Sequence, residues 1–90
     1  MSNNDGTVTI RFFARLREQV GMEQMQMPLP EGVRTIGQIA ELIMANHPKL
    51  GSEALLAEQV VTARNHNVVG FDERVAAGDE IAFFPPVTGG

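Results

Sequence analysis

The sequence predicts one α+β domain, in which a mixed sheet of four to five strands carries one main helix packed on one face. Three observations lead to this prediction. The chain has 90 residues, enough for one domain and too few for two. Hydrophobic residues make up 43% of it, which suffices for a buried core. Runs of alternating polar and apolar residues lie before and after a single segment with clear helical spacing.

Two strands are predicted in the N-terminal part, after a polar leader at residues 1–6. The run TVTIRFFA alternates, and its core-facing side chains are Val8, Ile10 and Phe12. A short polar turn of helix, RLREQV, follows and ends at Gly21. The run MEQMQMPL alternates again until Pro28. Two alternating runs with a short connection predict an antiparallel pair.

The clearest helix is predicted to begin after Thr35. Thr35 is a good N-cap, and Gln38 three residues later completes a capping box. Pro48 and Gly51 end the helix. The apolar stripe at helical spacing consists of Ile36, Ile39, Ala40 and Ile43.

The C-terminal part predicts two or three further strands. The runs VVTAR and VVGF flank a turn, NHN, and EIAFF follows a polar connector with a Gly78-Asp79 turn signal. The run SEALLAEQ predicts a helical turn before them. This order of elements is typical of a ubiquitin-like β-grasp fold. The domain is expected to cover residues 7–84, with an extended tail at 85–90.

Composition excludes several function classes. The chain has no cysteine, which removes disulfides, thiolate metal sites and a cysteine nucleophile. The net charge is −4 and the basic residues are scattered, so nucleic acid is not an expected partner. No apolar run is long enough to span a bilayer, and the first residues do not resemble a signal peptide. We therefore predict no membrane partner and a cytoplasmic location.

The titratable residues do not predict a catalytic or metal site. One histidine lies beside Pro48 and the other, His66, lies in a predicted turn, so no metal site is expected. The acidic pairs Asp72-Glu73 and Asp79-Glu80 are expected to be turn and surface residues rather than a catalytic dyad. Chemistry must therefore come from another part of the chain.

Two aromatic residues are out of phase with the predicted core. Phe13 and Phe84 have the parity opposite to Phe12 and Phe83, so they should lie on the face that the helix does not cover. Together with Val68 they predict a protein-binding patch. The alternatives are isolated surface aromatics, or a strand register shifted by one residue.

The last residues read FFPPVTGG. Pro85 and Pro86 cannot donate ladder hydrogen bonds and favour extended geometry, so they should direct the chain away from the sheet. Gly89 and Gly90 have no side chains and could enter a narrow slot. A terminal carboxylate could be activated as an acyl-adenylate. The alternative is a frayed terminus with accidental glycines.

Three segments together resemble the small, sulfur-carrier subunit of molybdopterin synthase: IRFFARLRE, VVGF before an acidic connector, and AGDEIAFFPPVTGG. The resemblance spans residues 7–90 and implies a β-grasp fold. It also implies that an adenylating enzyme, similar to ubiquitin-activating enzymes, uses ATP and Mg²⁺ to convert the Gly90 carboxylate to an acyl-adenylate. A sulfur donor protein then forms a thiocarboxylate. The tail inserts into the large catalytic subunit, where the sulfur passes to cyclic pyranopterin monophosphate.

The resemblance also assigns roles to residues. Gly90 carries the sulfur and Gly89 provides clearance. The docking patch is the same set that parity indicates: Phe13, Val68 and Phe84. The threaded segment is Pro85, Pro86, Val87 and Thr88. The chain is not expected to be catalytic alone or to bind a cofactor itself, and a heterotetramer with two copies of each subunit is a family expectation. A carrier for thiamine thiazole or tRNA thiolation, and a ubiquitin-like protein modifier, remain alternatives.

Overall fold

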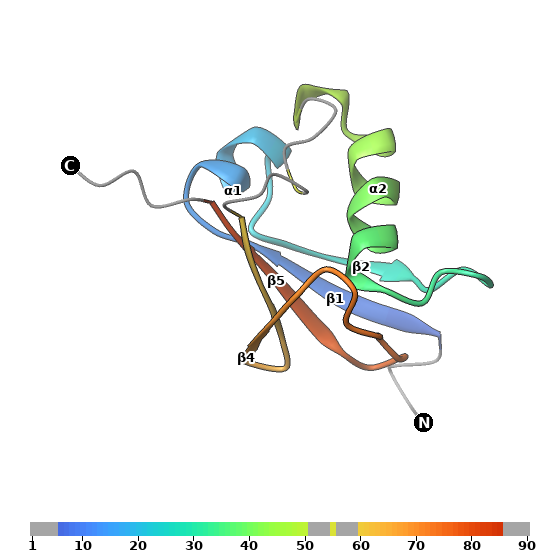
Figure 1. The fold of residues 1–90 in the computed structure, drawn as a ribbon. Helices are drawn as coiled ribbons and strands as arrows, with labels where there is room; N and C mark the ends of the chain where they lie inside the picture. The colour runs from blue at the N-terminus through green and yellow to red at the C-terminus, as the bar shows by residue number, and fades with distance from the viewer. Residues whose placement is uncertain (1–5, 51–54, 56–59, 86–90) are drawn as a thin grey trace.

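The computed structural model of the chain describes residues 6–50, 55 and 60–85. Five strands form one sheet in the order β2-β1-β5-β3-β4 (Figure 1). They are β1 (Thr7–Phe12), β2 (Gln24–Pro28), β3 (Val61–Arg64), β4 (Asn67–Val69) and β5 (Glu80–Phe84). Strands β1 and β5 are parallel and the other neighbours are antiparallel. The predicted mixed sheet, including the antiparallel pairing of β1 with β2, is confirmed.

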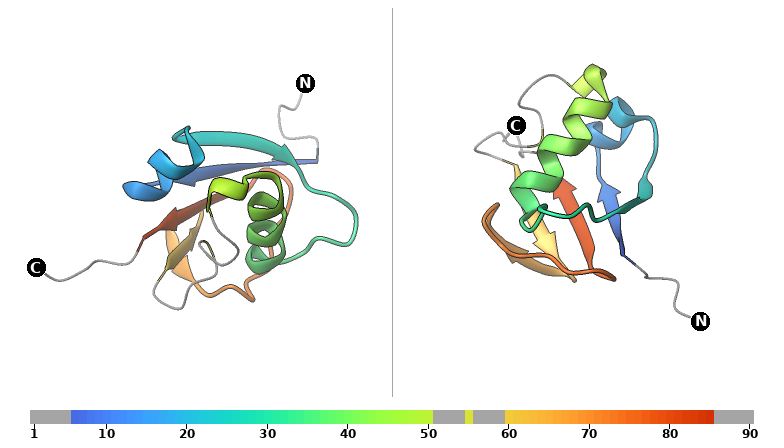
Figure 2. Two further views of the ribbon diagram at one scale, coloured as in Figure 1. Left: turned by 90° about the horizontal axis from the view of Figure 1, so that it is seen from above. Right: turned by 90° about the vertical axis from the view of Figure 1, so that its right-hand side faces the viewer.

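The main helix begins and ends where the sequence predicts. Helix α2 (Ile36–Asn46) starts with the predicted capping box: Thr35 Oγ1 accepts from the Gln38 N–H at 3.2 Å, and Gln38 Oε1 accepts from the Thr35 N–H at 3.1 Å. A 3₁₀ turn, η1 (Pro48–Leu50), follows. Figure 2 shows α2 lying against one face of the sheet. None of the described helices is long and apolar enough to cross a membrane.

The core lies between α2 and the sheet. The predicted stripe of α2 is at most 2% exposed at each of its four positions. It packs with the inward side chains of β1 and β5, and the rings of Phe12 and Phe83 stack with centroids 6.2 Å apart. The partners of this cluster from the two central strands are Val8, Ile10, Phe12, Ile81 and Phe83. Because these residues alternate with outward ones, the predicted register is confirmed.

The short helix α1 (Arg15–Val20) differs from its prediction as a polar turn. Leu16 is only 3% exposed and joins the core. Six residues make fewer than two turns, so one apolar residue is enough to give such a helix a buried side. The predicted end is correct, since Gly21 takes the left-handed conformation with φ of 90°. The chain enters α1 at Ala14, whose φ of 55° is uncommon for alanine.

Three predicted segments fall outside the description. Residues 1–5 of the predicted leader and residues 86–90 of the predicted tail are not among the described residues, and neither is the expected helical turn at 52–59, apart from Leu55. Leu55 is fully buried and contributes to the core. The described part of the chain therefore contains the docking patch and Pro85, while the reactive end of the tail stays a prediction from the sequence.

Candidate docking surface

An apolar patch occupies the face of the sheet opposite α2. We define the apolar patch as Phe13, Ala63, Val68, Ala82 and Phe84, which line one shallow hollow of about 210 Å³. The rings of Phe13 and Phe84 stack with centroids 4.4 Å apart and an angle of 13° between their planes. Val68 is 75% exposed. The structure thus brings together the three residues that parity indicated, and neither isolated aromatics nor a shifted register describes them.

Strand pairing explains why these side chains meet. Ala82 of β5 lies opposite Ala63 of β3, which lies opposite Val68 of β4. Residues that are paired across a ladder point to the same face of the sheet. Phe13 follows β1 and donates its N–H to the carbonyl of Phe83 at 3.2 Å, which holds its ring beside that of Phe84. The two alanines form the floor of the hollow because their side chains are small.

Sequence reasoning missed part of this surface. Ala63 and Ala82 were not assigned to it, and neither was Val61, which lies opposite Phe84 and is 42% exposed. The parity of β3 could have found Val61 and Ala63, because they alternate with the buried Thr62. The cluster is partly exposed, since Val68 is open to solvent and the two phenylalanines are half-buried, and an apolar cluster of this kind is characteristic of a site where another protein binds.

Charged side chains border the patch on one side. Arg11 lies on β1, opposite Ala82 of β5, and its Nη1 is 3.4 Å from Glu80 Oε2. Its guanidinium lies 5.5 Å from the centroid of the Phe13 ring. His66 Nε2 lies 3.9 Å from Glu80 Oε1. We call these three residues the charged rim. The side chains of Arg11 and Glu80 are 40% and 31% exposed, so the ion pair between them contributes less than about 1 kcal/mol to stability.

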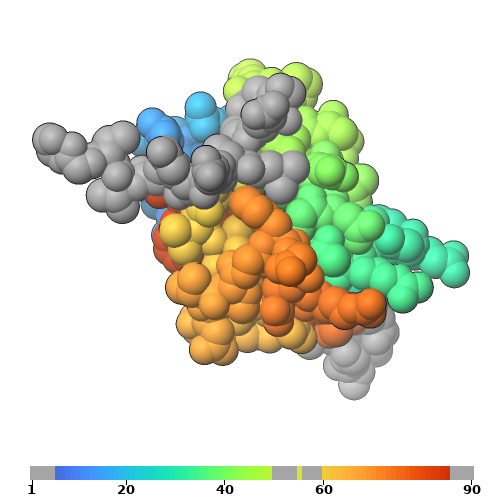
Figure 3. Space-filling view, in the orientation of Figure 1, coloured from blue at the N-terminus to red at the C-terminus, as the bar shows by residue number. Residues whose placement is uncertain are grey.

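A hydrogen-bonded network supports the turn that carries His66 and leads to Val68 of β4. Asp79 accepts from Arg64 Nε at 2.8 Å, from Asn65 Nδ2 at 3.0 Å and from the Ala76 N–H at 2.7 Å. Asn65 also accepts from the Glu80 N–H at 2.9 Å. The network ties the β3–β4 turn to the start of β5. In the space-filling view, β3, β4 and the loop after them fill the surface beside α2 (Figure 3).

Asp79 corrects a prediction. It was expected to be a turn and surface residue, yet it is only 8% exposed. Burial opposes ionisation of its carboxyl group, but the hydrogen bonds and the neighbouring guanidinium outweigh burial and hold the pKa of Asp79 below the ordinary value of 3.8. Its acceptor oxygens are all directed to the chain's own donors, which makes its role structural rather than catalytic, as the sequence suggested for the pair.

Replacement of Asp79 by alanine should destabilise the domain. We expect Asp79→Ala to lower the free energy of unfolding at pH 7 by about 2–3 kcal/mol, because charged hydrogen bonds are lost and Arg64 keeps only Glu73, at 3.1 Å, as an acidic partner. Urea unfolding measures this change, and Asp72→Ala, an exposed acid in the same loop, is the matched control. An Asp79→Ala variant as stable as the wild type would contradict the assignment.

The loss of stability in Asp79→Ala should depend on pH. A carboxyl whose pKa is lower in the folded state stabilises that state fully above its ordinary value of 3.8, and the contribution is lost as the pH falls below 3.8 through the folded pKa. The difference in unfolding free energy between the wild type and Asp79→Ala should therefore be constant from pH 5 to 7 and should narrow in this acidic range.

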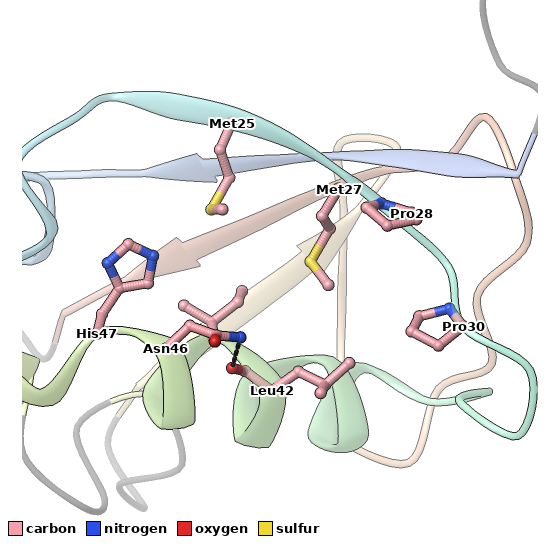
Figure 4. Close-up of a pocket in the computed structure, with 8 residues that line it drawn as sticks. Met25, Met27, Pro28, Pro30, Leu42, Asn46 and His47 are labelled. Atoms are coloured by element: carbon pink, nitrogen blue, oxygen red, sulfur yellow. Dashed lines mark hydrogen bonds between the residues drawn. The ribbon is translucent and has the colours of Figure 1, made fainter.

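A second hollow lies between β2 and α2 and has a different character. Figure 4 shows Met25 and Met27 of β2 pointing toward Leu42 and His47 on the helical side. The hollow has a volume of about 210 Å³. Met25 and Met27 are partly buried and pack against the core. The nearest polar contact drawn is within the helix, where Asn46 Nδ2 donates to the Leu42 carbonyl at 2.9 Å. Its lining is mostly apolar, so the hollow offers few polar groups that could orient a ligand.

The reactive end of the predicted site lies outside the described residues. Pro85 follows β5 directly and is half-buried, in agreement with its predicted place just beyond the sheet. The predicted threaded and reactive residues after it are Pro86, Val87, Thr88, Gly89 and Gly90, and none is described. Among residues 6–50, 55 and 60–85, no cluster of three His, Asp or Glu side chains could hold a metal ion.

Comparisons with known proteins agree with this arrangement. The ThiS family model matches residues 10–90. The chain is 36% identical over 87 residues to the molybdopterin synthase sulfur carrier subunit of Escherichia coli, covering 92% of this chain and 99% of that protein. It is 33% identical over 85 residues to small archaeal modifier protein 1 of Haloferax volcanii, covering 89% of this chain and 97% of that protein. The crystal structure of the Haloferax protein superposes with a TM-score of 0.79 at 32% identity, covering 94% of this chain and all of that one.

Proposed function

This chain belongs to the ThiS family, and from that premise we propose that it is the sulfur-carrier subunit of a molybdopterin synthase. One observation carries the proposal: the similarity to molybdopterin synthase sulfur carrier subunits runs over nearly the whole chain, and the family match reaches the final Gly90. The patch of stacked Phe13 and Phe84 directly before the tail supports it, since a carrier must dock before its terminus can react.

The proposed chemistry takes place at the Gly90 carboxylate. An adenylating enzyme uses ATP and Mg²⁺ to join this carboxylate to AMP, releasing pyrophosphate, because a free carboxylate is a poor acyl donor at neutral pH. A persulfide sulfur of a donor protein attacks the activated carbonyl carbon and AMP leaves. Reductive cleavage of the sulfur–sulfur bond by a thiol then yields the thiocarboxylate. Absence of cysteine from this chain fits the role, because the carried sulfur meets no internal thiol.

The proposed partner in the second half of the cycle is the large catalytic subunit. The apolar patch docks on it, while Pro85 to Thr88 thread toward its active site and Gly89 gives clearance. The thiocarboxylate then donates sulfur to cyclic pyranopterin monophosphate, and two such transfers build a dithiolene. In this proposal the acid, base and electrostatic groups of that reaction come from the partner; Asp79 is not a candidate, since its oxygens accept structural hydrogen bonds.

Intact mass spectrometry tests the proposal directly. Incubation of the protein with ATP, Mg²⁺, the adenylating enzyme and a sulfide source should add about 16 Da, the difference between sulfur and oxygen. Subsequent addition of the large subunit and cyclic pyranopterin monophosphate should restore the original mass and produce the dithiolene product. An unchanged mass in the first step would contradict the proposed carrier function. If Gly90 is loaded with sulfur but no dithiolene forms, the protein would be assigned to another sulfur-transfer pathway.

A second candidate function is that of a ubiquitin-like protein modifier. The similarity to small archaeal modifier protein 1, at 33% identity over 89% of this chain, favours it. In that case the activated Gly90 would form an isopeptide bond with a lysine amine of another protein. Peptide mapping of trypsin-digested conjugates from cells would detect lysines that carry the remnant 75–90, because Arg74 is the last basic residue of the chain. The carrier function instead requires a free terminal thiocarboxylate in intact protein from the same cells.

A further inference from the structure

Arg11 is the least satisfied polar group beside the docking patch. It lies on β1 in the row that continues through Ala82 to Ala63, so it points to the docking face. Its Nη1 has a long contact of 3.4 Å with Glu80. Its Nε is buried and has no hydrogen-bond partner among the described residues. A buried donor without an acceptor is uncommon in proteins and calls for an explanation.

The geometry indicates which edge of the guanidinium is available. Glu80 engages Nη1, while Nε belongs to the opposite edge of the planar group, which it shares with Nη2. That edge presents two parallel N–H groups that match the two oxygens of a carboxylate. Because Nε is covered by the chain's own atoms, the side chain must change rotamer to use it, a change that is common at interfaces.

Docking makes the missing acceptor more important. A partner that covers Phe13 and Phe84 also covers Arg11, because the guanidinium lies 5.5 Å from the Phe13 ring. Water then no longer solvates the 40% of the side chain that is exposed. A desolvated charge without a good partner strongly weakens binding, whereas a bidentate ion pair in the same place selects for a complementary surface.

We propose that Arg11 is a specificity-determining residue that receives an acidic side chain from the protein covering the apolar patch. The proposal rests on the proposed function, in which that protein is the large catalytic subunit of molybdopterin synthase. In this proposal the role of Arg11 is to choose and orient the partner, and Arg11 has no part in the sulfur chemistry itself.

Binding of the purified large subunit tests this role. We expect Arg11→Met to raise the Kd by about 10–100-fold at low salt, and Arg11→Lys to recover part of the loss because it keeps the charge without the planar edge. The affinity of the wild type should fall more steeply with salt than that of Arg11→Met. Arg74→Met removes the same charge at an exposed position beside Thr35 and should change the Kd less than about 2-fold.

A double-mutant cycle identifies the chemistry on the partner. Single replacement of acidic residues across the large subunit should reveal one whose loss weakens the wild type but not Arg11→Met. Equal binding by the wild type and Arg11→Met, or the lack of any coupled acidic residue, would overturn the inference and leave the proposed function intact. A wild-type protein that does not bind the large subunit would overturn both. Melting temperatures of the variants that equal that of the wild type would show that the differences in Kd come from docking and not from loss of folding.

Discussion

Removal of Gly89 and Gly90 will abolish thiocarboxylate formation, with loading expected to fall by at least about 100-fold. The deletion moves the terminal carboxylate back along the tail by about 7 Å, since an extended residue spans about 3.3–3.6 Å. Displacement of a reacting group by even 1 Å can cost about 100-fold in rate. The new terminus would also carry the branched Thr88 into a slot that the two glycines suit. Intact mass after incubation with the adenylating enzyme measures the result.

The fold and the docking surface should be unaffected by this deletion. The described core ends at Phe83, and the patch ends at Phe84, both before the tail. Melting temperature and affinity for the large subunit should therefore stay close to those of the wild type. Deletion of Ser2 and Asn3 is a length-matched control at the other end of the chain and should load normally. Normal loading after loss of both glycines would show that Gly90 is not the acceptor.

Alternation made the sheet predictable from the sequence. Because side chains in a strand alternate between faces, the sequence alone assigns Val8, Ile10 and Phe12 to one side and Phe13 to the other. The structure agrees at each of these positions. The capping box of α2 was equally visible, since its two side chains lie within one turn of each other. Local signals of this kind need no knowledge of distant contacts.

Features that depend on distant contacts were not predictable. Asp79 carries an ordinary turn signal after Gly78, and only the approach of Arg64, at the end of β3, and of Asn65, in the turn after it, makes it a buried acceptor. Leu16 lies in a polar run, so its burial follows from where the sheet places α1. The positive φ of Ala14 has no sequence signal, because alanine rarely adopts it.

The docking surface lies between these two cases. Parity placed Phe13 and Phe84 on the open face, but only the parallel pairing of β1 with β5 brings their rings to 4.4 Å. Such a pairing joins segments about 70 residues apart, which no local pattern reports. The charged rim was missed for the same reason, since Arg11 and Glu80 meet only across that ladder. Chemistry at the tail, by contrast, was indicated by residues that are adjacent in the chain.

Replacement of Phe84 by aspartate should weaken docking on the large subunit by about 30–1000-fold. The substitution removes one ring of the stacked pair and places a carboxylate within the apolar patch. Docking would then bury an unpaired charge, which costs about 2–4 kcal/mol or more, and each 1.4 kcal/mol changes the Kd about tenfold. Titration of the large subunit with labelled protein measures the change. We expect sulfur loading of Gly90 to be retained, provided that the adenylating enzyme does not bind through the apolar patch.

The controls for Phe84→Asp separate docking from folding. Gln26→Asp adds the same charge to the same face of the sheet, opposite Thr9 and outside the patch, so it should leave the Kd nearly unchanged. Phe84 is half-buried and its loss can lower stability, whereas Val68 is 75% exposed. Val68→Asp should therefore keep the melting temperature and still weaken docking by at least about 10-fold, because its side chain faces the partner directly. If Val68→Asp and Gln26→Asp bound equally well, the apolar patch would not be the docking surface, since only one of these charges lies within it.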